Sequence, residues 1–87
     1  MARGHILLID DDQTILALFR ASLEKAGYQV TIAPDGQAGV KAFQEQKPDL
    51  AIVDIAMPGI DGYQVIELMR ISEGGAGKAP VIVLTAH

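Results

Sequence analysis

The sequence predicts an α/β fold, in which helices cover both faces of a parallel sheet in three layers. Apolar strand-like runs alternate with segments of helical spacing, in the order βαβαβαβ. This alternation is typical of parallel sheets with right-handed crossovers. Residues 50–53 are all apolar and lead directly into Asp54, which is the pattern of a central strand buried on both faces.

The composition limits the classes of protein to consider. The 87 residues are enough for one small domain, which we expect to span residues 1–87. The chain is 49% hydrophobic and 21% charged, as in globular proteins, and it has no cysteine for a disulfide. Its net charge of −4, without a basic run, argues against direct nucleic-acid binding. No apolar stretch approaches membrane-spanning length, so we expect a cytoplasmic protein with no membrane partner.

The first half of the chain predicts two strands and two helices. Residues 5–10 form an apolar strand, and residues 13–26 follow as a helix with Asp12 as its N-cap and Gly27 as its stop. Residues 28–33 alternate in polarity, as expected of an edge strand. Residues 37–46 form a weaker helix, because Gly39 lowers its propensity. The side chains expected to face inward from the two helices are Ile15, Leu16, Phe19, Leu23, Ala26, Val40 and Phe43.

The second half predicts two more strands and one more helix. Residues 50–54 form the central strand, and a Pro/Gly-rich turn separates it from a helix at residues 63–72. Residues 81–86 form the last strand after Pro80. The apolar face expected for this helix consists of Val65, Ile66, Leu68 and Met69.

Polar side chains follow three of the predicted strands. Asp10 and Asp11 come after the first strand, Asp54 ends the central strand, and Thr85 lies at the end of the last strand. Because the carboxyl ends of parallel strands meet at one edge of the sheet, we expect these residues to converge there. Clustered carboxylates repel one another unless protons or a cation relieve them. Oxygen ligands of this kind suit a hard cation such as Mg²⁺.

Three separated motifs occur in the order and spacing of a known family. They are the Asp10-Asp11 pair, Asp54 followed by Met57-Pro58 and Asp61-Gly62, and Thr85-Ala86. From Ile6 to His87 the chain resembles the CheY-like receiver domain of two-component response regulators. This resemblance implies a flavodoxin-like fold with strand order 2-1-3-4. It implies a signalling phosphoacceptor rather than an enzyme.

The resemblance also implies a role for each site residue. Asp54 would accept a phosphoryl group from a phosphohistidine on a sensor histidine kinase or phosphotransfer protein. Asp11 and Asp54 would bind Mg²⁺ directly and Asp10 through water. The backbone carbonyl of Ala56 would complete the protein ligands, and the Thr85 hydroxyl would hydrogen-bond the transferred group.

One feature departs from the family pattern. A full receiver domain continues after the fourth strand with a helix, a fifth strand and a final helix, whereas this sequence stops at His87. The family's phosphoryl-pairing lysine belongs to that part, so we expect slow phosphorylation or no conformational readout. We also expect residues 81–84 to form an unprotected apolar edge that favours a homodimer.

Two alternatives to the phosphoacceptor hypothesis remain open at this stage. The first is an interaction or dimerisation module that keeps the receiver fold without a competent site. The second is a phosphatase of the haloacid-dehalogenase type, with Asp10 as nucleophile and Asp12 as acid/base, because residues 10–14 fit its D-x-D-x-T motif. Against this second alternative, 87 residues are too few for that fold, and the residues around Asp54 would be unexplained.

Overall fold

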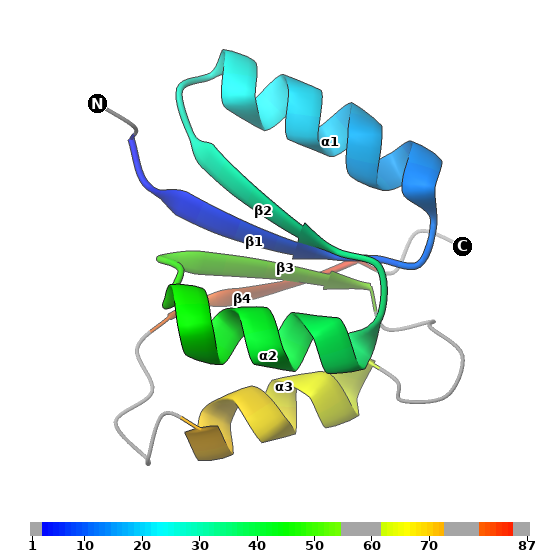
Figure 1. Cartoon of the computed structure of the whole chain (residues 1–87), viewed down its shortest axis with the longest axis vertical. Coiled ribbons are helices and arrows are strands. Elements are labelled where there is room, and N and C mark those ends of the chain that lie inside the picture. The colour runs from blue at the N-terminus through cyan, green and yellow to red at the C-terminus, as the bar shows by residue number, and fades with distance from the viewer. Residues whose placement is uncertain (1–2, 55–61, 73–78, 85–87) are drawn as a thin grey trace.

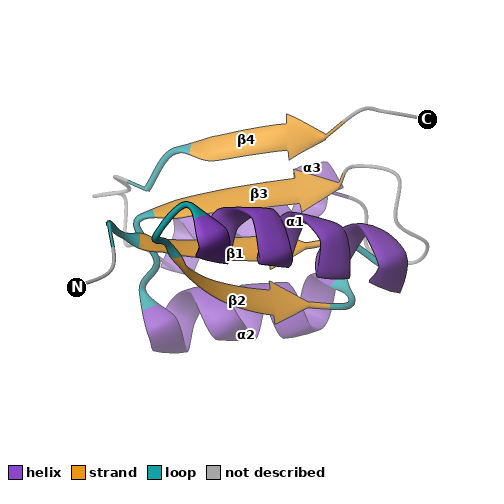
Figure 2. Ribbon diagram, turned by 90° about the horizontal axis from the view of Figure 1, so that it is seen from above, coloured by secondary structure: helices purple, strands orange, loops and turns teal. Residues whose placement is uncertain are grey.

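The strands lie side by side in one parallel sheet. The computed structural model describes residues 3–54, 62–72 and 79–84. In this part of the chain the strands are β1 (His5–Ile9), β2 (Gln29–Ala33), β3 (Leu50–Asp54) and β4 (Val81–Leu84). Their order is β2-β1-β3-β4, and all neighbouring pairs are parallel, so the arrowheads in Figure 2 point the same way. The predicted strand order and the edge position of β2 are confirmed.

The helices cover the sheet from both sides. Helix α1 (Gln13–Lys25) lies on one face, whereas α2 (Gly36–Gln46) and α3 (Gly62–Ser72) lie side by side on the other (Figure 1). The predicted three-layer architecture is therefore confirmed. None of the described helices is long and apolar enough to cross a membrane.

Strand β1 supplies the centre of the core on both faces. Leu7 and Ile9 face the α2–α3 layer, Leu8 faces α1, and all three side chains are 0% exposed. Burial on both faces is the reason that a central parallel strand consists of an unbroken apolar run. The core on the α2–α3 side also contains Val53, Phe43, Val65 and Met69.

The buried faces of two helices differ from the sequence-based prediction. On α1 the buried residue is Leu16, which packs with Leu8 and Val30, while Phe19 is 38% exposed and Ala26 lies just beyond the helix as its C-cap. On α3, Val65 and Met69 are fully buried but Leu68 is 40% exposed. The apolar residues span a wide arc of each helix, and one supporting layer covers only part of that arc.

The helix ends agree with the capping residues. The Asp12 side chain accepts hydrogen bonds from the backbone N–H groups of Thr14 and Ile15 at the start of α1. Asp35 caps α2 in the same way by accepting from the N–H of Ala38. Gly27 follows α1 with φ of 101°, a conformation that glycine adopts without strain. The predicted roles of Asp12 and Gly27 are confirmed.

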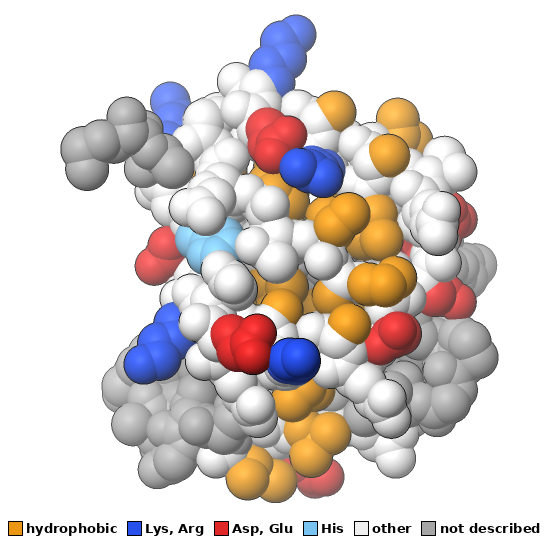
Figure 3. Space-filling model, viewed as in Figure 1, with side chains coloured by type: hydrophobic (Ala, Val, Ile, Leu, Met, Phe, Trp, Pro, Cys, Tyr) orange, Lys and Arg blue, Asp and Glu red, His pale blue; other side chains and the backbone are white. Residues whose placement is uncertain are grey.

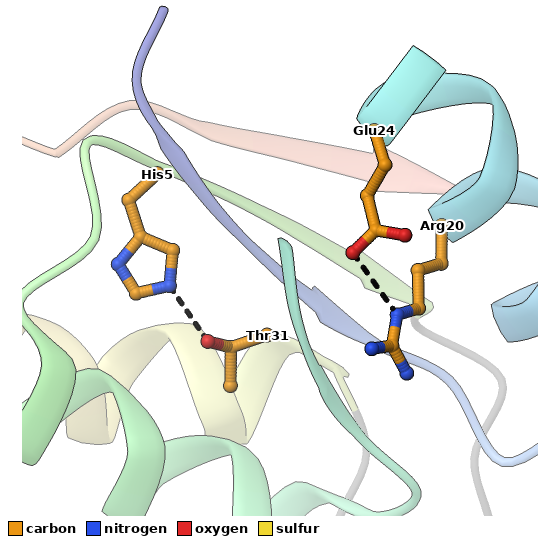
Figure 4. Close-up of polar contacts among 4 residues, drawn as sticks. All are labelled: His5, Arg20, Glu24 and Thr31. Atoms are coloured by element: carbon orange, nitrogen blue, oxygen red, sulfur yellow. Dashed lines mark hydrogen bonds and ion pairs between the residues drawn. The ribbon is translucent and has the colours of Figure 1, made fainter. Parts of the chain in front are cut away.

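Polar contacts away from the carboxyl ends of the strands are shown in Figure 4. The His5 Nε2 and Thr31 Oγ1 atoms lie 2.6 Å apart across β1 and β2, near the amino end of β1. Arg20 donates to Glu24 at 3.3 Å on the exposed side of α1. Such an exposed pair stabilises a helix by only about 0.3–0.5 kcal/mol. On the face in Figure 3, Lys and Arg side chains are scattered among acidic ones rather than gathered into a patch.

Candidate functional site

Two central strands deliver buried carboxylates to one edge of the sheet. Ile9 of β1 pairs with Val53 of β3, so the next residues, Asp10 and Asp54, lie beside each other. Asp10 is 1% exposed and Asp54 is 0% exposed, and the Oδ2 atom of Asp54 is buried. Burial of two carboxylates side by side is costly unless protons, hydrogen bonds or a cation compensate their charge.

Asp11 completes a three-carboxylate cluster, which we call the acidic site (Asp10, Asp11 and Asp54). One carboxylate oxygen from each residue lies within 4.8 Å of the corresponding oxygens of the other two. Asp11 is exposed, whereas its two partners are buried, so the site is open to solvent on the Asp11 side. The three residues therefore lie together at one edge of the sheet, as the sequence predicts.

Two hydrogen bonds fix Asp10, one at its side chain and one at its backbone. The Asp12 N–H donates to Asp10 Oδ1 at 2.9 Å, and the Asp10 N–H donates to the Ala33 carbonyl at 3.1 Å. The first bond bridges Asp10 and the N-cap of α1, and the second attaches Asp10 to the end of β2. The carboxylate thus sits at a junction of β1, β2 and α1.

The electrostatics of the acidic site favour a proton or a cation. The pKa of Asp10 is raised above its ordinary value of 3.8, first because burial removes water from the carboxylate. The Asp12 N–H acts in the opposite direction, while the charge of Asp54, a side-chain hydrogen bond with Asp54 and the charge of Asp11 raise the pKa further. A divalent cation would relieve the same repulsion without a proton.

Several expected site residues lie outside the described residues. They are Ala56 and Thr85, together with Met57-Pro58 and Asp61 of the turn after β3, whereas Gly62 is the first residue of α3. The sequence did not reveal the bond from the Asp12 N–H to Asp10. Its only signal in the sequence is an N-cap aspartate two residues after a strand-end aspartate. His5 is not part of the site, because it begins β1 at the opposite end of the sheet.

Comparisons with known proteins agree with this geometry. The family model described as the response regulator receiver domain matches residues 6–87. The transcriptional regulatory protein AfsQ1 of Streptomyces coelicolor is 40% identical over 82 residues, which cover 94% of this chain and 35% of AfsQ1. The transcriptional regulatory protein CseB of Streptomyces avermitilis is 37% identical over 83 residues, which cover 95% of this chain and 34% of CseB. The chain spans about a third of the length of these curated relatives.

Solved structures give the same result. The N-terminal domain of a response regulator receiver protein from Methanoculleus marisnigri superimposes with a TM-score of 0.90 at 31% identity, covering 99% of this chain and 69% of that one. The receiver domain of sensor histidine kinase PA1611 from Pseudomonas aeruginosa superimposes with a TM-score of 0.89 at 34% identity, and the match covers 99% of this chain and 70% of that one. In that protein a magnesium ion is coordinated in the active site cleft. The chain therefore belongs to the response regulator receiver domains, the signalling modules of two-component phosphorelays.

Proposed function

We propose that this chain is a phosphoacceptor, which takes a phosphoryl group onto Asp54 with the help of Mg²⁺ at the acidic site. The observation that carries the proposal is the position of Asp54. It is fully buried at the end of a central strand, and oxygens of Asp10 and Asp11 lie within 4.8 Å of its own. A nucleophile fixed in this way needs little reorganisation when a donor arrives.

The donor set of the acidic site fits Mg²⁺. All three side chains offer carboxylate oxygens, which this hard cation prefers, and the cluster is open to solvent on the Asp11 side. Asp11 and Asp54 would bind the ion directly and Asp10 through water, and the Ala56 carbonyl is the further ligand that family membership suggests. The magnesium in the cleft of the PA1611 receiver domain supports this assignment. When bound, the ion would supply positive charge to phosphoryl oxygens.

The chemical step assigned to this chain is a single displacement at phosphorus. A carboxylate oxygen of Asp54 forms the new P–O bond, and the P–N bond to the donor imidazole breaks, so that its electron pair returns to the nitrogen. Strand β3 holds the nucleophile, and the bond from the Asp12 N–H holds Asp10 beside it. The Thr85 hydroxyl, at a position outside the described residues, would hydrogen-bond the transferred group.

The donor that we propose is a sensor histidine kinase or a phosphotransfer protein. Relatives include the receiver domain of the hybrid histidine kinase CckA, which is 33% identical with a TM-score of 0.82. The curated relatives are named as transcriptional regulatory proteins, and we infer a cytoplasmic setting for the exchange from that role.

Intact mass spectrometry tests the phosphoacceptor proposal. The chain is incubated with Mg²⁺ and a small-molecule phosphodonor, and we expect a gain of one phosphoryl unit that Asp54→Asn abolishes. Asp35→Asn is the matched control, because Asp35 also follows a strand but serves as a helix cap, which asparagine maintains. This control variant should gain the phosphoryl unit as the unmodified chain does.

Two results of this experiment would count against the proposal. Uptake that persists in Asp54→Asn would place the acceptor elsewhere. No uptake by a folded chain that binds Mg²⁺ would favour the alternative, an interaction module with the receiver fold.

We further propose that the outer edge of β4 is a contact between two copies of this chain. β4 is last in the strand order and pairs only with β3 among the described residues. Ile82 is 49% exposed, and no charge interrupts Val81–Leu84. An apolar strand edge of this kind readily pairs with a copy of itself about a two-fold axis.

A further inference from the structure

Asp12 bonds on one side to the acidic site and on the other to α1. Its backbone N–H donates to Asp10 Oδ1 at 2.9 Å. Its side-chain Oδ1 accepts from the N–H groups of Thr14 at 2.9 Å and Ile15 at 3.3 Å. Its carbonyl accepts from the N–H of Leu16 at 3.0 Å. The residue is therefore fixed by its backbone and by its side chain at the same time.

The helix that holds Asp12 is anchored in the core. Leu16 is only 3% exposed and packs against Leu8 and Val30, which lie on β1 and β2. The first turn of α1 therefore has a fixed position over the sheet, and the side-chain cap ties Asp12 to that turn. In this state Asp12 has an extended backbone with φ of −91° and ψ of 106°. That conformation presents its N–H to the Asp10 carboxylate.

We propose that Asp12 is a positioning residue for the acidic site, whose side-chain cap on α1 holds its own N–H against Asp10. This inference rests on the proposed Mg²⁺-dependent function. Without the cap, Thr14 and Ile15 lose their acceptor, and residue 12 is held to α1 only through the bond from the Leu16 N–H to its carbonyl. The Asp10 carboxylate can then rotate away from the arrangement that the three oxygens share. Metal ligands depend in general on such outer hydrogen bonds for their orientation.

The negative charge of Asp12 offers a competing explanation, because any nearby carboxylate attracts a cation. Two substitutions separate charge from cap. Asparagine caps a helix as well as aspartate does but carries no charge, whereas alanine has neither property. Asp12→Asn should therefore preserve the positioning, and Asp12→Ala should lose it.

The first measurement is the dissociation constant of Mg²⁺ alone, obtained by calorimetric titration of the 87-residue chain. We expect Asp12→Asn to stay within about threefold of the unsubstituted chain, since an exposed charge contributes little. We expect Asp12→Ala to bind about tenfold more weakly than Asp12→Asn. Asp35→Ala is the matched control, because it removes the equivalent cap of α2, and it should leave the dissociation constant unchanged.

The second measurement is hydrogen exchange of the residue 12 amide without Mg²⁺. We expect protection in the unsubstituted chain and in Asp12→Asn, and its loss in Asp12→Ala. Equal Mg²⁺ affinities for Asp12→Asn and Asp12→Ala would overturn the inference, as would equal weakening in Asp35→Ala. If the unsubstituted chain does not bind Mg²⁺ at all, the proposed function itself fails, and the exchange result still decides whether the cap holds the amide.

Discussion

At the scale of single residues, Asp10 combines deep burial with a second carboxylate at its side. A carboxyl group in this position gains from holding a proton when no cation is present, because the neutral form costs less to bury than the charged form and can donate to Asp54. A proton and the proposed Mg²⁺ would therefore relieve the same repulsion and compete for the same pair of side chains.

The raised pKa of Asp10 makes the stability of the metal-free chain depend on pH. The pKa of Asp10 is raised in the folded state, so the folded chain keeps this proton to a higher pH than the unfolded chain does. The stability that the proton confers is present below the ordinary pKa of 3.8 and is lost as the pH rises through the raised value. We expect the free energy of unfolding of the unsubstituted chain, relative to Asp10→Asn, to fall over this range.

Urea unfolding at a series of pH values, with a chelator present, measures this dependence. Asp10→Asn cannot titrate at this position, so its curve should lack the fall, whereas Asp35→Asn should keep it. Saturating Mg²⁺ should remove the fall, since the ion stabilises the charged carboxylates. A curve for Asp10→Asn with the same fall as the unsubstituted chain would show that other groups cause it.

At the scale of elements, the approach of α2 to β1 depends on one glycine. Gly39 is buried in α2, and a Cβ atom there would lie 2.5 Å from Ile9 Cδ1 and 2.8 Å from Ile9 Cγ1. Ile9 is 0% exposed and immediately precedes Asp10. The sequence suggested only that Gly39 weakens the helix, because propensity is a local property and the contact with Ile9 is not.

A bulky side chain at position 39 should push α2 away from β1. We expect Gly39→Val to lower the free energy of unfolding by about 1–3 kcal/mol, because the new side chain overlaps Ile9. Gln44→Val introduces valine at an exposed position of α2, away from Ile9, and should lower the free energy of unfolding by less than about 1 kcal/mol. Chemical denaturation of both variants provides the comparison, and equal losses would mean that the contact with Ile9 is unimportant.

The sequence predicts the elements of this fold better than it predicts how they pack. Strand and helix order, the caps at Asp12 and Gly27, and the meeting of Asp10, Asp11 and Asp54 all follow from local patterns combined with parallel topology. Local patterns do not predict that α1 buries Leu16 rather than Phe19, or that Leu68 of α3 is exposed. Both depend on which neighbouring element covers each helix. The bond from the Asp12 N–H to Asp10 depends on loop dihedral angles that no residue pattern specifies.

At the scale of the whole molecule, the two edges of the sheet have different character. The β2 edge includes polar Gln29 and Thr31, whereas β4 is apolar throughout and Ile82 is half exposed. Among the described strands, β4 is the edge with the longer unbroken apolar run, and the proposed interface between copies is therefore placed there.

Light scattering after size-exclusion chromatography tests this interface. We expect the chain to be a dimer at micromolar concentration and Ile82→Lys to be a monomer, since a charge on the edge strand blocks pairing. Ile71→Lys is the control, because Ile71 is 67% exposed and belongs to α3 rather than to β4, and this variant should remain dimeric. A folded monomer for the unsubstituted chain would refute the dimer.

The two buried acids follow β1 and end β3, which are the inner strands of the sheet. The free energy of local unfolding varies along a protein chain, and it is usually small for binding sites that are built on loops. Here the backbone positions of the two acids can separate only when the central pair of strands separates, and that event is close to global unfolding. The two acids should therefore stay side by side for as long as the chain stays folded, so we expect regulation to act through what reaches the site rather than through its assembly.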